Sequence, residues 1–306
     1  MLEQFSFALG VTAPILSLLV LGVIFRRSGF ISQEFIDTSN SFVFNISLPC
    51  LLFFSIARTP LTQSGNIPLF LFGFIVTLGL AFVFWLLSCL LLPQDKRGVF
   101  TQGAFRGNLG IIGIALVVNA YGNEMLAVAS LYMAVIAVLD NPLAIFILKP
   151  KGHHAFKSIL TNPIIIAVVM GLVFAAFSVP IPSFVKQTGQ YLAQLTLPLA
   201  LICIGGSLYW RDFQHHHKEV VWATIAKLIL MPLMGILIAI ELGFRGQELG
   251  LLYLMLSSPT AVSSYIMAKK MTAHGTIAAE IIALTTAASS VVITIGLIIL
   301  QVLGYI

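Results

Sequence analysis

Charged residues are scarce in this 306-residue chain: Asp, Glu, Lys and Arg together make up 9% of it, whereas a soluble domain typically carries about 25%. Hydrophobic residues make up 59%, and the mean hydropathy is +1.03. A water-soluble protein of this length could not hide so much apolar surface. The scarcity of charge therefore excludes a soluble globular protein and indicates one whose natural solvent is the lipid bilayer.

Cysteine and recognisable catalytic motifs are also scarce. The three cysteines, Cys50, Cys89 and Cys203, all lie inside apolar runs, so we predict small buried side chains and neither a disulfide nor a metal site. Because the sequence has no phosphate-binding loop and no catalytic triad pattern, we expect no enzyme, no nucleotide-driven pump and no cofactor. The basic residues stand singly or in pairs between apolar runs, which argues against a nucleic-acid partner.

Apolar runs of roughly twenty residues, each enough for a helix to cross a hydrocarbon core of about 30 Å, recur along the chain. The N-terminus lacks a basic leader, and the first cations follow the first apolar run, so we expect that run to be a true span. We predict an all-α transmembrane fold with ten spans, at 6–25, 36–57, 67–92, 99–119, 124–148, 159–178, 187–209, 218–240, 247–267 and 276–303.

Lysine and arginine are distributed unevenly between the predicted loops. Loops after even-numbered spans hold three, Arg58, Lys186 and Arg245. Loops after odd-numbered spans hold eleven: Arg26, Arg27, Lys96, Arg97, Lys149, Lys151, Lys157, Arg211, Lys218, Lys269 and Lys270. Since positive charge gathers on the cytoplasmic side, we expect a multi-pass protein of the plasma (inner) membrane with both termini outside.

Two spans are interrupted by the same pattern. Residues 45–49 in the second span and 194–198 in the seventh both read polar, any residue, hydroxyl, Leu, Pro, and they lie 149 residues apart. A proline inside a helix removes a backbone donor and frees a carbonyl. We therefore predict helix breaks at Pro49 and Pro198.

The same offset relates Gly110 in the fourth span to Pro259 in the ninth. Corresponding interrupted helices in two halves are typical of a transporter with an internal repeat and mark its binding site. We predict two halves, 1–150 and 151–306. Because five spans per half is an odd number, the halves are expected to be inverted, with broken helices 4 and 9 crossing near the midplane.

The break in the ninth span resembles the start of a helix, in which Ser258 suits the N-cap and Pro259 the first helical position. Asn108 suits the cap of the second half of the fourth span in the same way. Two such N-termini facing each other expose free N–H groups and partial positive charge. Together they would bind an anion without a charged side chain.

Several short motifs, in a fixed order over essentially the whole chain, carry a family resemblance. They are residues 45–49, Arg106-Gly107-Asn108-Leu109-Gly110, Asn141-Pro142, Asn162-Pro163, residues 227–232 and Pro259. With them the chain resembles the auxin efflux carrier family, which includes plant auxin exporters and bacterial malonate-type carriers. The resemblance implies ten spans in inverted repeats, a crossover of spans 4 and 9, and elevator-like transport of small carboxylates. Plant members look to have proline at both crossovers, whereas glycines occupy the first crossover here.

The predicted substrate-binding residues surround the breaks: Asn108, Gly110, Ser257, Ser258, Pro259 and Thr260, flanked by Asn45 and Thr196. A buried cation costs about 2.5–3.5 kcal/mol on insertion scales, so Lys227 is expected to be a substrate counter-charge or a group that replaces a coupling cation. The alternative is a lysine that extends to the cytoplasmic face. Asp140, with Asn141 beside it, is a candidate to carry a proton, or else a carboxylate paired for packing.

The sequence thus predicts a secondary transporter that moves small organic anions by alternating access. The coupling ion, proton or sodium, stays open, and so does a homodimer. The alternatives are a sodium-coupled symporter of the bile-acid-transporter type, which would need oxygen-rich ion sites, and a channel, which would show no substrate counterflow.

Overall fold

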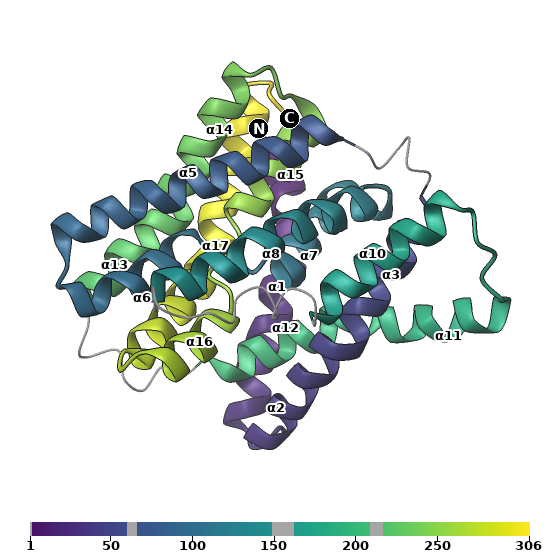
Figure 1. The fold of residues 1–306 in the computed structure, drawn as a ribbon, viewed down its shortest axis with the longest axis horizontal. Helices are drawn as coiled ribbons and strands as arrows, with labels where there is room; N and C mark the ends of the chain where they lie inside the picture. Colours follow the sequence, from purple (N-terminus) through teal and green to yellow (C-terminus); the bar gives the residue numbers. More distant parts are fainter. Residues whose placement is uncertain (1, 60–65, 149–161, 209–216) are drawn as a thin grey trace.

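The computed structural model describes residues 2–59, 66–148, 162–208 and 217–306. These residues are helical apart from short connections (Figure 1). Their one extended pairing is an antiparallel bridge between Gly107 and Thr260. The helical elements in chain order are α1 (Leu2–Arg27), α2 (Gln33–Phe42), η1 (Val43–Ser47), α3 (Leu48–Ala57), α5 (Ile67–Leu91), α6 (Gln94–Phe105), η2 (Leu109–Gly113), α7 (Ile114–Tyr121), η3 (Asn123–Met125), α8 (Leu126–Leu148), α10 (Pro163–Ala176), α11 (Ser183–Gln194), α12 (Thr196–Ser207), α13 (His217–Ile225), η4 (Ala226–Leu230), α14 (Met231–Glu241), α15 (Gly246–Leu256), α16 (Ser263–Met271) and α17 (Gly275–Val302).

Seven stretches among the described residues are long and apolar enough to cross a membrane, and they match predicted spans 1, 2, 3, 5, 7, 8 and 10. They are Glu3–Arg27, Gln33–Ala57, Ile67–Leu91, Asn123–Leu148, Ser183–Ser207, Lys218–Glu241 and Gly275–Val302. The all-α membrane-spanning class is therefore confirmed.

The other three predicted spans look different, so the count of ten is not established. Predicted span 4 consists of α6 and the shorter helix Leu109–Tyr121, with a break between them. Predicted span 9 is divided in the same way into α15 and α16. Predicted span 6 is the 14-residue helix α10, and the first residues assigned to it, 159–161, lie outside the described part of the chain.

Helical elements recur in the same order at a spacing close to 150 residues. Gln33–Ala57 and Ser183–Ser207 are both 25 residues long and begin 150 residues apart. The element α5 spans 67–91, and the run from α13 to α14 spans 217–241, again 150 residues later. The long stretch Gln33–Ala57 is followed by α5, and Ser183–Ser207 is followed by the run from α13 to α14, so these elements come in the same order.

Wide helical turns accommodate two of the prolines. Just before Pro49 and Pro232, the backbone amide of the preceding residue bonds five residues back, to the carbonyls of Val43 and Ala226. Such π-helical turns let a helix continue past a proline that would otherwise leave backbone groups unpaired. They are the elements η1 and η4.

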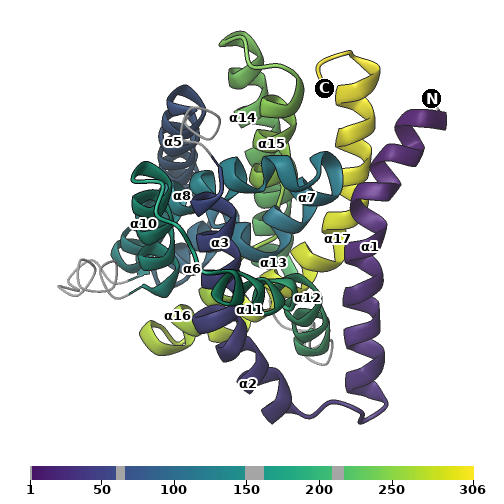
Figure 2. The ribbon, with the colours of Figure 1, turned by 90° about the vertical axis from the view of Figure 1, so that its right-hand side faces the viewer.

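The long helix α1 lies beside α17 along one side of the molecule (Figure 2), and it also packs against α12. The helix α3 packs in a similar way against α10 and α11. The start of α1 and the end of α17 lie at the same end of the molecule in both views. Four of the loop cations used for the orientation, Lys149, Lys151, Lys157 and Arg211, lie outside the described residues.

Candidate functional site

The two broken helices meet at their breaks, which we call the crossover (residues 106–108 and 257–262). The Asn108 amide donates to the Pro259 carbonyl at 2.7 Å, and the Ala261 amide donates to the Arg106 carbonyl at 3.1 Å. An unpaired backbone group is costly where there is no water to satisfy it. Each break therefore satisfies backbone hydrogen-bonding groups of the other, so the two breaks stabilise each other.

Gly107 stands where the two breaks come closest. A β-carbon at this position would lie 2.5 Å from Ser258 Oγ and 3.2 Å from Lys227 Nζ. The first separation is shorter than a side-chain contact allows unless the Ser258 hydroxyl moves, so the close approach of the two segments favours glycine here. The glycine noted in the sequence at this crossover is therefore explained by packing.

Thr260 links the second break to two neighbouring helices. Its hydroxyl donates to the Gly103 carbonyl of α6 at 2.7 Å, and its amide donates to Thr285 Oγ1 of α17 at 3.2 Å. Thr285 in turn bonds the carbonyl of Ile281 at 2.7 Å. These bonds hold the extended segment against α6 and α17 in a buried setting.

The prediction that Ser258 and Pro259 begin a helix is wrong, because α16 begins only at Ser263. Ser257 and Ser258 instead bond back to carbonyls of the preceding helix, Tyr253 at 2.6 Å and Met255 at 2.8 Å. The reason is the pairing with the other break, which keeps residues 259–261 extended.

Asn108 does not cap with its side chain either. Its backbone carbonyl accepts bonds from the amides of Ile112 at 3.1 Å and Gly113 at 3.0 Å, while its side chain makes no capping bond. The first turn after the break is therefore wide, and it is held by the Asn108 backbone alone.

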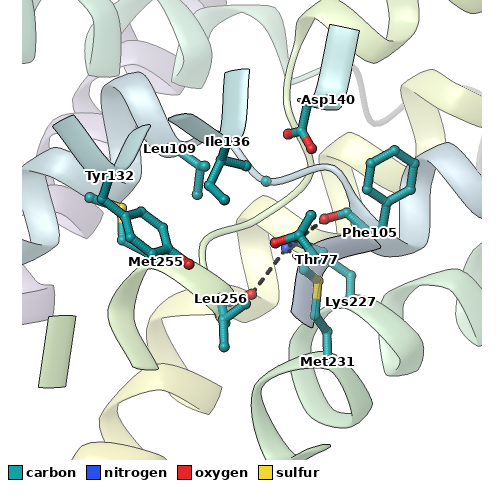
Figure 3. A pocket seen from close by; sticks show the side chains of 11 residues that line it. Thr77, Phe105, Leu109, Tyr132, Ile136, Asp140, Lys227, Met231, Met255 and Leu256 are labelled. Carbon is teal, nitrogen blue, oxygen red and sulfur yellow. Dashed lines mark hydrogen bonds between the residues drawn. The ribbon is translucent and has the colours of Figure 1, made fainter. Parts of the chain in front are cut away.

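Lys227 is completely buried (0% exposed) in the wide turn η4. Its ammonium donates to the Leu256 carbonyl at 3.0 Å and the Phe105 carbonyl at 3.4 Å, and it lies 3.3 Å from Met231 Sδ (Figure 3). Phe105 and Leu256 are the last residues of α6 and α15. The lysine therefore does not extend to the surface and binds the C-terminal ends of both broken helices at once.

Asp140 from α8 lies on the same internal cavity as Lys227, on the opposite side of it in Figure 3. The side chain is 5% exposed, its Oδ1 has no hydrogen-bond partner among the described residues, and both Arg106 and Lys227 lie within electrostatic range. The cavity measures about 10 Å³, which is about the room for one water molecule. Thr77 and Tyr132 complete its polar lining.

Arg106 and Asn141 form a second polar contact next to this cavity. One Arg106 nitrogen donates to Asn141 Oδ1, and another lies 2.7 Å from Met267 Sδ of α16. Asn141 Nδ2 bonds the carbonyl of Ala137 at 3.1 Å. Arg106 is buried, which differs from a cation anchored at the membrane surface, and it connects α8 with both sides of the crossover.

The flanking residues fall into two groups. Gly110 lies near α3, because a β-carbon there would be 3.3 Å from Leu48, the neighbour of Pro49. Thr196 is fully buried at the start of α12, which packs against η2. Asn45, however, is exposed and bonds the carbonyl of Ser41 in its own helix at 2.8 Å, so the structure does not bring it to the crossover. Pro198 lies in the first turn of α12, just after a one-residue break at 195 that separates α11 from α12.

Sequence reasoning missed the main partners of Lys227. The Phe105 and Leu256 carbonyls carry no residue-type signal, because any residue can end a helix. Thr77 and Tyr132 lie in long apolar spans, where a single hydroxyl gives no indication of the face it occupies. No group of three or more His, Cys, Asp or Glu side chains in the described part of the chain could hold a metal ion.

Comparison with known proteins relates the chain to membrane transporters. A family profile described as "Membrane transport protein" matches residues 7–158 and 152–297. The chain is 26% identical to an "Uncharacterized transporter" of Methanothermobacter thermautotrophicus, over 85% of this chain and 88% of that protein. It is 24% identical to the "Uncharacterized transporter YfdV" of Escherichia coli K12, over 88% and 90% of the two chains.

A third relative has a substrate in its name. The chain is 25% identical to a "Putative malonate transporter" of Rhizobium meliloti over 93% of both proteins. The family match extends over nearly the whole chain, and the family and these relatives are transporters rather than enzymes. The chain therefore belongs to the membrane transport protein family, the auxin efflux carrier family that its motifs predict.

Proposed function

We propose that this protein is a secondary transporter that carries small organic anions across the membrane, with the carboxylate bound at the crossover. The observation that carries the proposal is the contact of Lys227 with the last carbonyls of α6 and α15. Four helix ends converge at the crossover, two of them negative and two positive. Because Lys227 neutralises the two negative ends, the two positive ends are left to attract an anion.

The positive ends belong to the helix Leu109–Tyr121 and to α16. Free backbone N–H groups at the start of a helix bind carboxylates well. Gly110 and Ser263 are partly accessible there, and the buried hydroxyl of Ser264 has no partner among the described residues. In this proposal these groups, together with Asn108 and Thr260, form the substrate site.

The predicted site residues take different roles in this proposal. Asn108, Pro259 and Thr260 fix the crossover, Gly110 lies on the side of it that faces α3, and Thr196 starts α12, which packs against η2. Ser257 and Ser258 would contact substrate only if they release their bonds to α15. Asp140 and Asn141 act from behind the crossover, as coupling or counter-charge groups, and do not touch the substrate.

For the mechanism we propose elevator-like alternating access by two inverted five-helix halves, 1–150 and 151–306. The recurrence of elements about 150 residues apart supports the repeat. The packing of α1 against α12, and of α3 against α10 and α11, supports a framework separate from the helices around the crossover. Such repeats place their binding site at the broken helices.

The proposed setting is the plasma (inner) membrane, with both termini outside. Two partners beyond the substrate remain part of the proposal: a coupling ion, proton or sodium, and a second copy of the chain. The relative named as a malonate transporter supports a short dicarboxylate as substrate.

Uptake by purified protein in liposomes tests the proposal. A panel of labelled malonate, succinate and an aromatic carboxylate is offered with imposed pH and sodium gradients, and empty liposomes serve as the control. We expect saturable uptake of at least one carboxylate, together with counterflow when unlabelled substrate is trapped inside. Uptake of only neutral or cationic solutes would contradict the anion site, and flux without counterflow would indicate a channel.

A further inference from the structure

The ends of α6 and α15 form a pair of oxygen ligands that point at one place. The last carbonyls of a helix have no partner inside the helix and carry partial negative charge. Here the carbonyls of Phe105 and Leu256 both lie within 3.4 Å of a single atom, Lys227 Nζ. In broken-helix transporters, ends of this kind can coordinate a sodium ion or a proton.

The surroundings of that atom add to the oxygen ligands. The hydroxyl residues Thr77 and Tyr132 and the carboxylate of Asp140 line the cavity that borders Lys227. Asp140 Oδ1 has no hydrogen-bond partner among the described residues, although it is almost fully buried. Carbonyl, carboxylate and water oxygens are the ligands that hard cations prefer. Two soft neighbours are also present: Met231 Sδ, 3.3 Å from Lys227 Nζ and from the same helical run, and Met255, which lines the cavity.

We propose that the ammonium group of Lys227 permanently occupies a cation site formed by the ends of α6 and α15, with Asp140 across the adjoining cavity, so that no exchangeable alkali ion is needed at this site. A covalently attached cation cannot dissociate, so a sodium gradient cannot be coupled through this site. The role of this site in transport rests on the proposed function, whereas the cation site itself could exist without that function. Removing the ammonium should leave an oxygen-lined space that a sodium ion can enter.

The test measures thermal unfolding of the purified protein in detergent, titrated with sodium chloride against choline chloride at constant ionic strength. In Lys227→Ala, sodium should raise the unfolding midpoint saturably, by about 3 °C or more. Lys227→Met, which fills the space without charge, is the matched control and should not respond. Lys227→Ala/Asp140→Asn should lose the response, because the negative charge that lines the adjoining cavity is gone.

The unaltered protein gives an independent result. It should respond equally to sodium and choline, and a stabilisation specific to sodium would overturn the proposal. If Lys227→Ala does not yield a monodisperse protein, Lys227→Ser is measured instead, and the absence of a sodium response in a folded variant of either kind would equally overturn it.

Liposome uptake separates this inference from the proposed function. We expect uptake by the unaltered protein to be independent of sodium, and uptake by Lys227→Ala to recover at least partly when sodium is added. Sodium binding by Lys227→Ala with no carboxylate transport in any form of the protein would keep the cation site and reject the function. Carboxylate transport by the unaltered protein, with no sodium binding by Lys227→Ala or Lys227→Ser, would keep the proposed function and reject the cation site.

Discussion

At the scale of single residues, Lys227 is a charged group that is costly to bury. A lone cation in the apolar interior costs several kcal/mol, and the side chain is fully enclosed. Two helix-end carbonyls offset that cost, and they do so only where the helices are broken. The lysine and the breaks therefore depend on each other: the breaks supply carbonyls for the ammonium, and the ammonium supplies a donor for those carbonyls.

We predict that Lys227→Ala lowers carboxylate uptake at least about tenfold in sodium-free medium, while membrane insertion and the amount of protein stay the same. The uncompensated negative charge of the two helix ends would then repel the substrate carboxylate, an effect worth roughly 0.3–1 kcal/mol at each end and more when buried. Uptake into liposomes measures the effect, and Lys218→Ala, an exposed lysine of the same helical run, is the control. Full activity of Lys227→Ala would remove this residue from the mechanism.

Gly107 yields a second prediction at this scale. Gly107→Ala should destabilise the protein by about 1–3 kcal/mol and impair transport, because its methyl group would lie 2.5 Å from Ser258 Oγ. The double variant Gly107→Ala/Ser258→Ala should recover part of the loss, since it removes that oxygen. Thermal unfolding and uptake are measured together, with Gly79→Ala of α5 as the control because nothing lies within 4 Å of that position. An equal loss in the single and double variants would contradict this explanation.

Which of these residues the sequence could indicate depends on how unusual each one is in its surroundings. Lys227 and Asp140 are charges within apolar spans, so their importance could be predicted, and the structure places them on one cavity. Asn45 was predicted beside the same breaks, but it faces outward. A span that is apolar all round does not reveal which of its faces is buried, so a polar residue on it cannot be assigned to one side.

At the scale of helical elements, the breaks in predicted spans 4 and 9 could be located from glycine and proline, and the structure has both. The start of α16 could not, since the usual capping pattern of Ser258 and Pro259 was overridden by contact with residues 106–108. That contact joins positions about 150 residues apart. Local sequence preferences cannot report such a pairing, because the competing interaction comes from the other half of the chain.

Thr260 gives a prediction about how the elements are held together. Thr260→Val should lower the free energy of unfolding by about 1–3 kcal/mol, because the Gly103 carbonyl of α6 would lose a buried donor. Thermal unfolding in detergent measures the change. Thr224→Val is the matched control, since its buried hydroxyl bonds the Val220 carbonyl at 2.8 Å within its own helix, α13. Equal effects of the two substitutions would show that the link between the extended segment at Thr260 and α6 adds no stability.

At the scale of the whole molecule, the packing of α1 suggests which parts move. This helix contacts α12, which belongs to the proposed framework, and also α17, which bonds the crossover through Thr285. If the crossover helices move relative to the framework, the contact between α1 and α17 must slide while the contact between α2 and α12 stays fixed. Each contact contains a close pair of side chains that can be replaced by cysteines.

We predict that a disulfide between α1 and α17 stops transport. In a variant without the native cysteines, Thr12→Cys/Thr294→Cys replaces two hydroxyls that lie 2.8 Å apart, and oxidation should reduce uptake at least about tenfold. Reduction of the disulfide should restore uptake, because the constraint is geometric and the crossover is unaltered. The control keeps Cys203 of α12 and introduces Ser39→Cys on α2, which packs against α12 and whose Ser39 side chain interacts with the Cys203 thiol. This second disulfide lies within the framework and should leave uptake unchanged, so equal inhibition by both would argue against movement of α17 along α1 as the transport step.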